Sequence, residues 1–242
     1  MINYRGNKLS VENKNVLKIA KNNQTPFYLY SAKAIKDNFE QFCRVFKKIN
    51  PLICFSVKSN SNPKILRILK GLGAGADVVS GGELLKVLNA GISPKKIVFS
   101  GVGKSTDELK MAIKRKILLI NAESYSEIAL INKLSKSSKR KTSVGLRLNP
   151  DIDAKTLGKI STGRAEDKFG LSRKKLLEVC KNLKEFKHIE LNSLSVHIGS
   201  QILTDVPFKR TLKVIEEIIN KTKINFKFID LGGGFGISYS SR

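Results

Sequence analysis

A regular alternation of short apolar runs with amphipathic segments constrains this chain more than any other feature. Seven apolar runs follow residue 31, and segments with helical spacing separate them. Such alternation predicts right-handed βαβ units and a parallel sheet. The predicted strands cover residues 52–57, 75–80, 96–101, 117–121, 143–149, 190–199 and 226–234.

Helix starts can be predicted from capping residues. Ser31 precedes apolar residues at helical spacing, and Pro63 opens a second helix. The pairs Ser105–Glu108 and Ser124–Glu127 have the capping-box pattern. Before residue 31 the only strand-like run is "PFYLY", residues 26–30.

Two architectures can hold such a sheet, a doubly wound open sheet and a (β/α)₈ barrel. An open sheet gathers its ligands mainly at one switch point, whereas a barrel uses the carboxyl ends of many strands. Here polar or glycine residues follow nearly every predicted strand, which favours the barrel. With only seven strands, the barrel is one strand short.

Composition narrows the class of protein. The 242 residues are 41% hydrophobic, enough for one substantial core. No apolar run approaches the roughly 18 residues of a membrane span, and the amino terminus lacks a secretory h-region, so we expect no membrane partner. Cys43, Cys54 and Cys180 are odd in number and lack C-x-x-C spacing, which predicts a reducing cytoplasm and no metal site.

The formal net charge of +25 raises nucleic acid as a partner. The lysines, however, are spread along the whole chain, and the densest run, 133–141, has no aromatic residue to stack on bases. We therefore expect no specific nucleic-acid binding, only weak adhesion at low salt.

Lys58 ends an apolar run in "ICFSVKSNSNP". Its charge must be desolvated or neutralised there, so it is either a reactive amine or a solvated strand terminus. The run "DLGGGFGI" brings Gly232, Gly233 and Gly234 after the last predicted strand. Their N–H groups could form a phosphate cradle, with a tight structural turn as the alternative.

Two further residues stand out in apolar strands. His197 is one of only two histidines and is either a cofactor contact or a hydrogen-bonded core residue. Arg147 would need an anionic partner if buried, and Asp77 or Glu83 could supply it. A lysine, a glycine cradle and an aromatic ring together suit pyridoxal 5'-phosphate, which needs an amine, anion donors and a stacking face.

The chain also resembles a known family. Its motifs are similar, in order, to those of the amino-terminal portion of the diaminopimelate decarboxylases, which belong to the alanine-racemase-like, fold type III class of pyridoxal-phosphate enzymes. "ISTGRAEDKFG" and "HIGSQ" resemble the diaminopimelate branch more than the ornithine or arginine branches. The other matching stretches are "TPFYLYS", "FSVKSNSNP", "GADVVSGGEL", "GVGKSTDEL", "INAES", "LRLNPDIDAKT" and "DLGGGFGI".

The resemblance implies a pyridoxal 5'-phosphate-dependent decarboxylase that converts meso-2,6-diaminopimelate to L-lysine in the cytoplasm as a homodimer. It implies an α/β fold, a TIM-type (β/α)₈ barrel truncated after about seven strands, over residues 31–242. Residues 1–30 would pack with a β-domain. Lys58 would form the Schiff base and His197 would stack on the cofactor ring. Ser200, Gly232, Gly233 and Gly234 would hold the phosphate, and Asp77, Glu83 and Arg147 would form the surrounding polar shell.

The family's eighth strand, with a Glu-Pro-Gly-Arg segment, and its carboxy-terminal β-domain, with a cysteine proton donor, have no match here. We therefore expect these 242 residues alone to be poorly active or inactive, as a fragment would be. A related ornithine- or arginine-type decarboxylase and a non-catalytic cofactor-binding fragment are the alternatives.

Overall fold

The fold is built on a parallel sheet of seven strands that lie side by side in sequence order. The computed structural model describes residues 2–154, 162–164 and 167–239. The order β10-β9-β8-β7-β6-β5-β4 has no reversal, whereas a doubly wound sheet reverses at its switch point. The barrel-type prediction is therefore confirmed. The strands are β4 (Cys54–Ser56), β5 (Gly75–Val78), β6 (Ile97–Phe99), β7 (Leu119–Ala122), β8 (Thr142–Arg147), β9 (Ile189–Ser195) and β10 (Phe228–Asp230).

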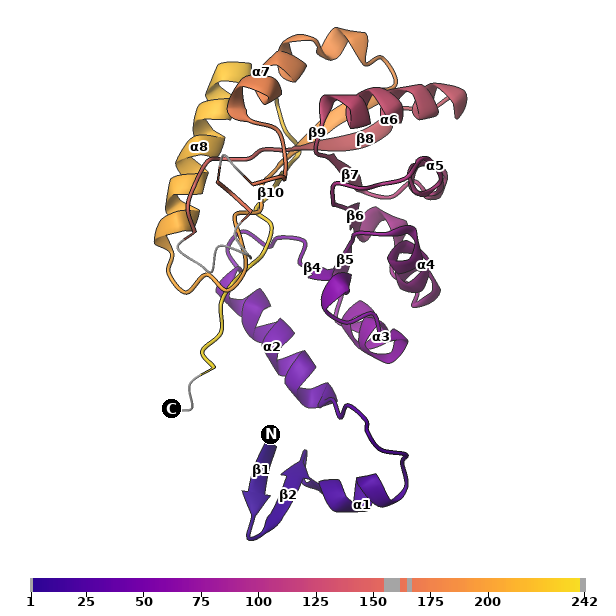
Figure 1. Ribbon diagram of the computed structural model, residues 1–242, viewed down its shortest axis with the longest axis vertical. Coiled ribbons are helices and arrows are strands. Elements are labelled where there is room, and N and C mark those ends of the chain that lie inside the picture. The colour runs from indigo at the N-terminus through magenta and orange to yellow at the C-terminus, as the bar shows by residue number, and fades with distance from the viewer. Residues whose placement is uncertain (1, 155–161, 165–166, 240–242) are drawn as a thin grey trace.

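Helices cover the outer face of this curled sheet (Figure 1). Each lies between two strands in sequence, so the chain returns to the sheet after every helix, as right-handed crossovers require. The helices are α3 (Pro63–Gly71), α4 (Gly81–Asn89), α5 (Thr106–Arg115), α6 (Tyr125–Ser137), α7 (Arg173–Lys181) and α8 (Val206–Thr222). No helix among the described residues is both long and apolar enough to cross a membrane.

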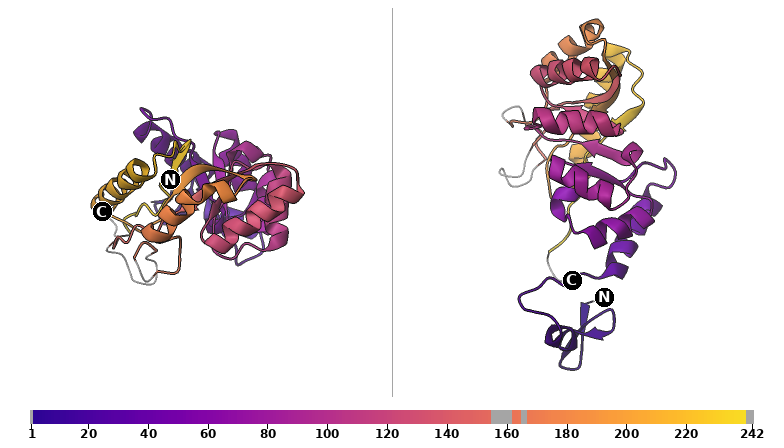
Figure 2. Two further views of the ribbon diagram at one scale, coloured as in Figure 1. Left: turned by 90° about the horizontal axis from the view of Figure 1, so that it is seen from above. Right: turned by 90° about the vertical axis from the view of Figure 1, so that its right-hand side faces the viewer.

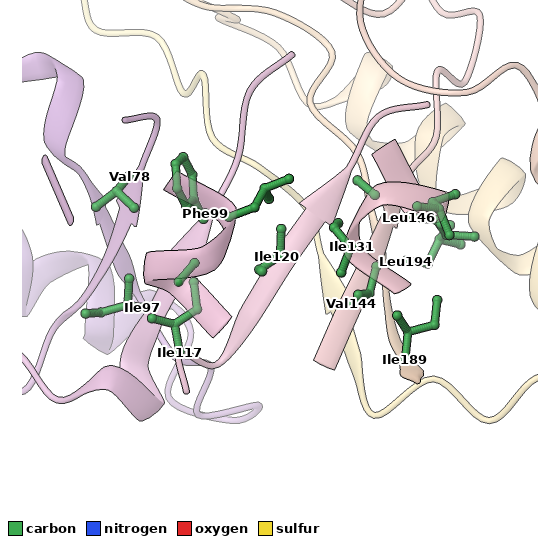
Figure 3. Close-up of a cluster of buried hydrophobic side chains, with 14 of the residues drawn as sticks. Val78, Ile97, Phe99, Ile117, Ile120, Ile131, Val144, Leu146, Ile189 and Leu194 are labelled. Carbon is green, nitrogen blue, oxygen red and sulfur yellow. The ribbon is translucent and has the colours of Figure 1, made fainter. Parts of the chain in front are cut away.

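The main hydrophobic core lies between the sheet and this helical layer. Phe99, Ile120 and Leu146 project from neighbouring strands and are almost completely buried (Figure 3). Ile131 of α6 packs into the same cluster from the helical side. Burial of apolar area on the outer face thus holds the helices to the sheet.

The inner face of the sheet carries small and polar residues instead. Side chains alternate between the two faces of a strand, so Asp77, Asn121 and Asp230 point away from the helices. Asn121 Nδ2 donates to Asp230 Oδ2 over 2.8 Å, although two strands separate β7 from β10. Three strand spacings would be about 14 Å in a flat sheet. The bond therefore crosses the interior of a strongly curled sheet.

The amino-terminal segment forms a small unit at one end of the molecule (Figure 2). It contains the antiparallel strands β1 (Ile2–Arg5), β2 (Lys8–Val11) and β3 (Lys14–Asn15), followed by α1 (Val16–Lys21). The carboxylate of Glu12 accepts hydrogen bonds from Ser31 Oγ and Lys33 N at the start of α2 (Ala32–Val45).

The prediction of a strand at residues 26–30 is wrong. This segment is irregular, and no strand pairs with it among the described residues. Tyr28 is 88% exposed, and Tyr30 is also exposed. Strand propensity alone does not form a strand where no neighbouring strand supplies hydrogen bonds.

The predicted helix starts are largely confirmed. Ser31 Oγ accepts from Ala34 N, and the Ser105–Glu108 capping box is complete. At α6, Ser124 caps Glu127 N as predicted. The Glu127 carboxylate, however, accepts from Glu123 N rather than from Ser124 N, because its other oxygen binds the Lys104 ammonium.

Glu108 also links two neighbouring helices. One carboxylate oxygen accepts from Ser105 N, and the other accepts from Gly81 N at the start of α4, over 2.6 Å. The hydrogen bond from Gly81, followed by that from Ser105, lowers the pKa of Glu108. The carboxylate therefore stabilises the fold above its ordinary pKa, and this contribution is lost as the pH falls through the lowered value.

We predict that Glu108→Ala lowers the free energy of unfolding by about 2 kcal/mol at pH 7, because two backbone donors lose their acceptor. Urea denaturation measures the loss. Asp107→Ala is the matched control, since Asp107 lies in the same helical turn and only pairs with the exposed Lys110. The control should cost less than about 0.5 kcal/mol. Equal midpoints for the two variants would contradict the prediction.

Candidate functional site

The sequence-predicted residues meet at the carboxyl ends of the strands. Lys58 lies in a 3₁₀ turn, Val57–Ser59, directly after β4, and its side chain is exposed. Asp77 lies in β5, His197 follows β9, and the glycine loop (232–234) follows β10. Parallel strands bring these ends to one rim, which is where barrel enzymes have their active sites.

Asp77 is a half-buried carboxyl group on the inner face. Burial is the main cause of a pKa raised to about 6, and the Asp230 carboxylate contributes to the increase. The hydrogen bond from Ser100 Oγ, at 2.7 Å, and the charges of Lys58 and Arg147 oppose this shift. Asp77 therefore exchanges its proton close to neutral pH, at a position where the Lys58 charge affects its pKa.

His197 is held as a neutral imidazole. Its pKa is lowered to about 4, mainly by burial and also by the positive charges of Arg147 and Lys58. Gly233 N donates to His197 Nδ1 over 3.3 Å, which requires an unprotonated Nδ1. Thr162 Oγ1 donates to the His197 carbonyl. The histidine is thus both a hydrogen-bonded residue and a ring with a fixed orientation at the rim.

The glycine loop packs closely against the segment that follows β9. Gly232 has φ +67°, and a Cβ there would lie 2.5 Å from the carbonyl oxygen of Val196. Gly234 has φ +85°, and a Cβ there would overlap the carbonyl oxygen of Gly199. Only glycine meets both requirements, positive φ and close backbone approach. The contact brings the loop beside Ser200, which is exposed.

The loop's N–H groups are not equivalent. Gly232 N donates to Asp230 Oδ1 over 2.9 Å, and Gly233 N donates to His197. Within the described part of the chain, the Gly234 N–H has no acceptor. A loop with a free backbone donor, packed closely against the segment after β9, fits an anion such as a phosphate group.

The predicted partners of Arg147 are wrong. Arg147 is 7% exposed and pairs with Glu123, Nη1 to Oε1 2.8 Å, rather than with Asp77 or Glu83. Glu123 directly follows β7, the neighbour of β8, which carries Arg147. Asp77 lies three strands away, on β5. The guanidinium also lies over the ring of Phe169, 4.8 Å from its centre.

Glu83 has a capping role in this structure. It lies in the first turn of α4, where its Oε2 accepts from Val79 N over 2.9 Å. This contact resembles that of Glu127 at α6, so both glutamates tie a helix to the end of the preceding strand. Glu83 therefore lies beside the rim without contacting Lys58 or Arg147 through any of the interactions seen among the described residues.

Sequence reasoning missed the roles of Asp230 and Lys104 at the site. Asp230 and Asn121 line the inner face, and the available signal was a polar residue at the end of each apolar run, "FKFID" and "ILLIN". Lys104, from "GVGKSTDEL", has a completely buried side chain and donates to Glu127 Oε1 at 2.7 Å and to the Asn121 carbonyl at 2.8 Å. It joins the loop after β6 to β7 and to α6.

Metal and thiol chemistry find little support in the described residues. These residues hold no group of three or more His, Cys, Asp or Glu side chains that could bind a metal ion. All three cysteines are free, and burial raises the pKa of the Cys54 thiol to about 12. The predicted motif "ISTGRAEDKFG" falls partly outside the described residues, at 160–161 and 165–166, as do 155–156 of "LRLNPDIDAKT".

A curled sheet with a lysine after its first barrel strand and a glycine loop after its seventh defines a class, the fold type III pyridoxal-phosphate enzymes. Residues 32–242 match the family described as "Pyridoxal-dependent decarboxylase, pyridoxal binding domain". The chain belongs to this family, and its cofactor is pyridoxal 5'-phosphate.

Individual relatives agree with this assignment. Diaminopimelate decarboxylase from Helicobacter pylori strain J99 is 43% identical to this chain, and the match covers 90% of this chain and 55% of the relative. Diaminopimelate decarboxylase from Aquifex aeolicus is 37% identical, and the match covers 98% of this chain and 57% of the relative. A crystal structure of the Helicobacter pylori enzyme complexed with L-lysine matches with a TM-score of 0.90 at 41% identity, over 94% of this chain and 59% of that one. The chain thus spans little more than half the length of these relatives.

We predict that Asp77→Asn stabilises the protein at pH 7.5. The folded-state pKa of about 6 lies above the ordinary 3.8, so the folded state binds the proton more tightly. The resulting stabilisation is complete below pH 3.8 and is lost as the pH rises through 6. The neutral amide avoids this loss, for a gain of about 1–2 kcal/mol at pH 7.5 after allowing for solvent screening.

Thermal unfolding at pH 7.5 and at pH 4 measures the effect, with Asp107→Asn as an exposed control. The gain should shrink at the lower pH. A gain of the same size at both pH values would show that ionisation of Asp77 is not its source.

Proposed function

We propose that the protein catalyses the decarboxylation of meso-2,6-diaminopimelate to L-lysine with pyridoxal 5'-phosphate. The observation that carries this proposal is the similarity to named diaminopimelate decarboxylases along almost the whole chain. L-Lysine, the expected product, is present in the Helicobacter pylori structure that this chain resembles. The alternative substrates ornithine and arginine have no comparable support at this level of identity.

In the proposed reaction, the bound cofactor supplies the electron sink that accepts the electron pair of the breaking carbon–carboxylate bond. Lys58 would hold the cofactor by condensation of its amine with the cofactor's aldehyde, with loss of water. Its place in the 3₁₀ turn after β4 keeps this amine exposed at the rim, where a cofactor can reach it. The role of the lysine would therefore be to hold the cofactor at the rim, where a substrate amine can also reach it.

The other rim residues position the cofactor. His197 would present a neutral ring to the pyridine, so it would add no positive charge beside the cofactor ring. Ser200 and the glycine loop, 232–234, would hold the phosphate, with the Gly234 N–H as the backbone donor that no protein acceptor occupies in the described part of the chain. Asp77 holds or releases a proton beside Lys58, since its pKa of about 6 is close to physiological pH. Glu83 and Arg147 support the rim through their bonds to Val79 N and Glu123.

We further propose that residues 31–242 are the cofactor-binding barrel domain and that residues 1–30 pack with a β-domain of the whole protein. The exposed side chains of Tyr4, Leu17 and Tyr28 in the amino-terminal segment provide apolar area for such packing. A homodimer in the cytoplasm is proposed with it, and three free cysteines suit a reducing compartment.

We predict that pyridoxal 5'-phosphate produces a visible absorbance band with the purified protein and that Lys58→Ala abolishes it, because Lys58 presents the proposed Schiff-base amine at the rim directly after β4. Lys64→Ala is the matched control, since Lys64 lies six residues away in the first turn of α3. An unchanged band in Lys58→Ala would refute the role of this lysine.

We predict that the whole polypeptide encoded by the reading frame containing this sequence releases carbon dioxide from meso-2,6-diaminopimelate. The value of kcat/KM should exceed those for L-ornithine and L-arginine by at least about 100-fold, as expected when recognition groups are left unpaired by the wrong substrate. Carbon dioxide release is measured with each amino acid separately. Preference for ornithine or arginine would overturn the proposed substrate while leaving the family assignment intact.

A further inference from the structure

Asp230, the last residue of β10, accepts three hydrogen bonds on the inner face of the sheet. Its Oδ1 accepts from Gly232 N at 2.9 Å. Its Oδ2 accepts from Asn121 Nδ2 at 2.8 Å and from Ser195 Oγ at 3.0 Å. One carboxylate thus joins the glycine loop to β7 and to β9.

The two anchors of this carboxylate are rigid. Asn121 and Ser195 are 1% and 4% exposed, and both lie within strands of the sheet. Hydrogen bonds to an ionised carboxylate are shorter and stronger than those between neutral groups. The Asp230 carboxylate therefore fixes the position of Gly232 relative to the interior strands of the barrel.

This anchoring also decides which loop amides an anion can use. The Gly232 N–H is taken up by Asp230 and the Gly233 N–H by His197. The Gly234 N–H has no acceptor in the part of the chain that the structure describes. Because the first two donors face protein acceptors, the loop offers its donors to a ligand only from Gly234 onward.

We propose that Asp230 is a positioning residue that sets the glycine loop for the cofactor's phosphate group, an assignment that rests on the proposed function. A carboxylate is itself a poor neighbour for an anion, so Asp230 acts through Gly232 rather than as a ligand. Its effect is specific to the phosphate end of the cofactor, far in sequence from the lysine that binds the aldehyde.

The contrast between pyridoxal 5'-phosphate and pyridoxal tests this assignment, because pyridoxal has the aldehyde and lacks the phosphate. Both are titrated into the purified protein, and binding is followed by the visible absorbance that depends on Lys58. Asp230→Ala should weaken binding of the phosphorylated compound by about 10- to 100-fold and change binding of pyridoxal by less than about 2-fold.

Exchanging the two partners separates geometry from charge. In Asp230→Asn the amide loses either the Gly232 or the Asn121 contact, whichever way it is turned, and affinity should fall about 10-fold. The double variant Asn121→Asp/Asp230→Asn restores an N–H···O bond between these positions. It should recover affinity for pyridoxal 5'-phosphate to within about 3-fold of the unaltered protein, a coupling that independent sites would not show.

Ser195→Ala is the matched control, since it removes one bond to Asp230 and leaves the bond from Gly232. It should preserve the ratio of the two affinities. Equal losses for both compounds in Asp230→Ala, no loss, or no recovery in the double variant would each overturn the positioning role. Absence of Lys58-dependent absorbance with either compound in the unaltered protein would instead overturn the proposed function, and this assignment with it.

Discussion

The hydrogen bond from Asn121 to Asp230 across the interior of the sheet is the contact on which the arrangement of the site depends. It joins β7 to β10, which are separated by two other strands, over 2.8 Å. Such a bond forms only when the sheet curls, and the curl brings the strand ends together at one rim. In a sheet without this curl, Lys58 after β4 and the glycine loop after β10 would lie at opposite edges.

The two faces of the sheet have different roles: the outer face stabilises the fold, and the inner face carries the polar groups of the site. Apolar residues on the outer face, such as Phe99 and Ile120, pack against the helices and form the main core. The inner face is left with small and polar groups, including Asp77 and Asn121. Typical barrels fill this space with bulky branched side chains, whereas small and polar groups line it here.

Burial shifts the pKa values of two rim residues, Asp77 and His197, so that the neutral form of each is favoured. The pKa of the acid is raised to about 6, and that of the base is lowered to about 4. Arg147 differs from these two groups in having a buried ion-pair partner, Glu123. The rim therefore combines a paired guanidinium, an exposed lysine, a neutral ring and an acid whose pKa is raised to about 6.

The sequence by itself determined the order of strands and helices, the capping of α2 and α5 and the positions of Lys58, His197 and the glycine loop, because these features depend on local spacing. It did not determine that residues 26–30 remain irregular, that Arg147 pairs with Glu123, or that Asp230 holds Gly232. Those outcomes depend on which groups the curled sheet brings within hydrogen-bonding distance. Residues such as Asn121 and Asp230 are separated by more than one hundred positions along the chain, and only the tertiary structure makes them neighbours.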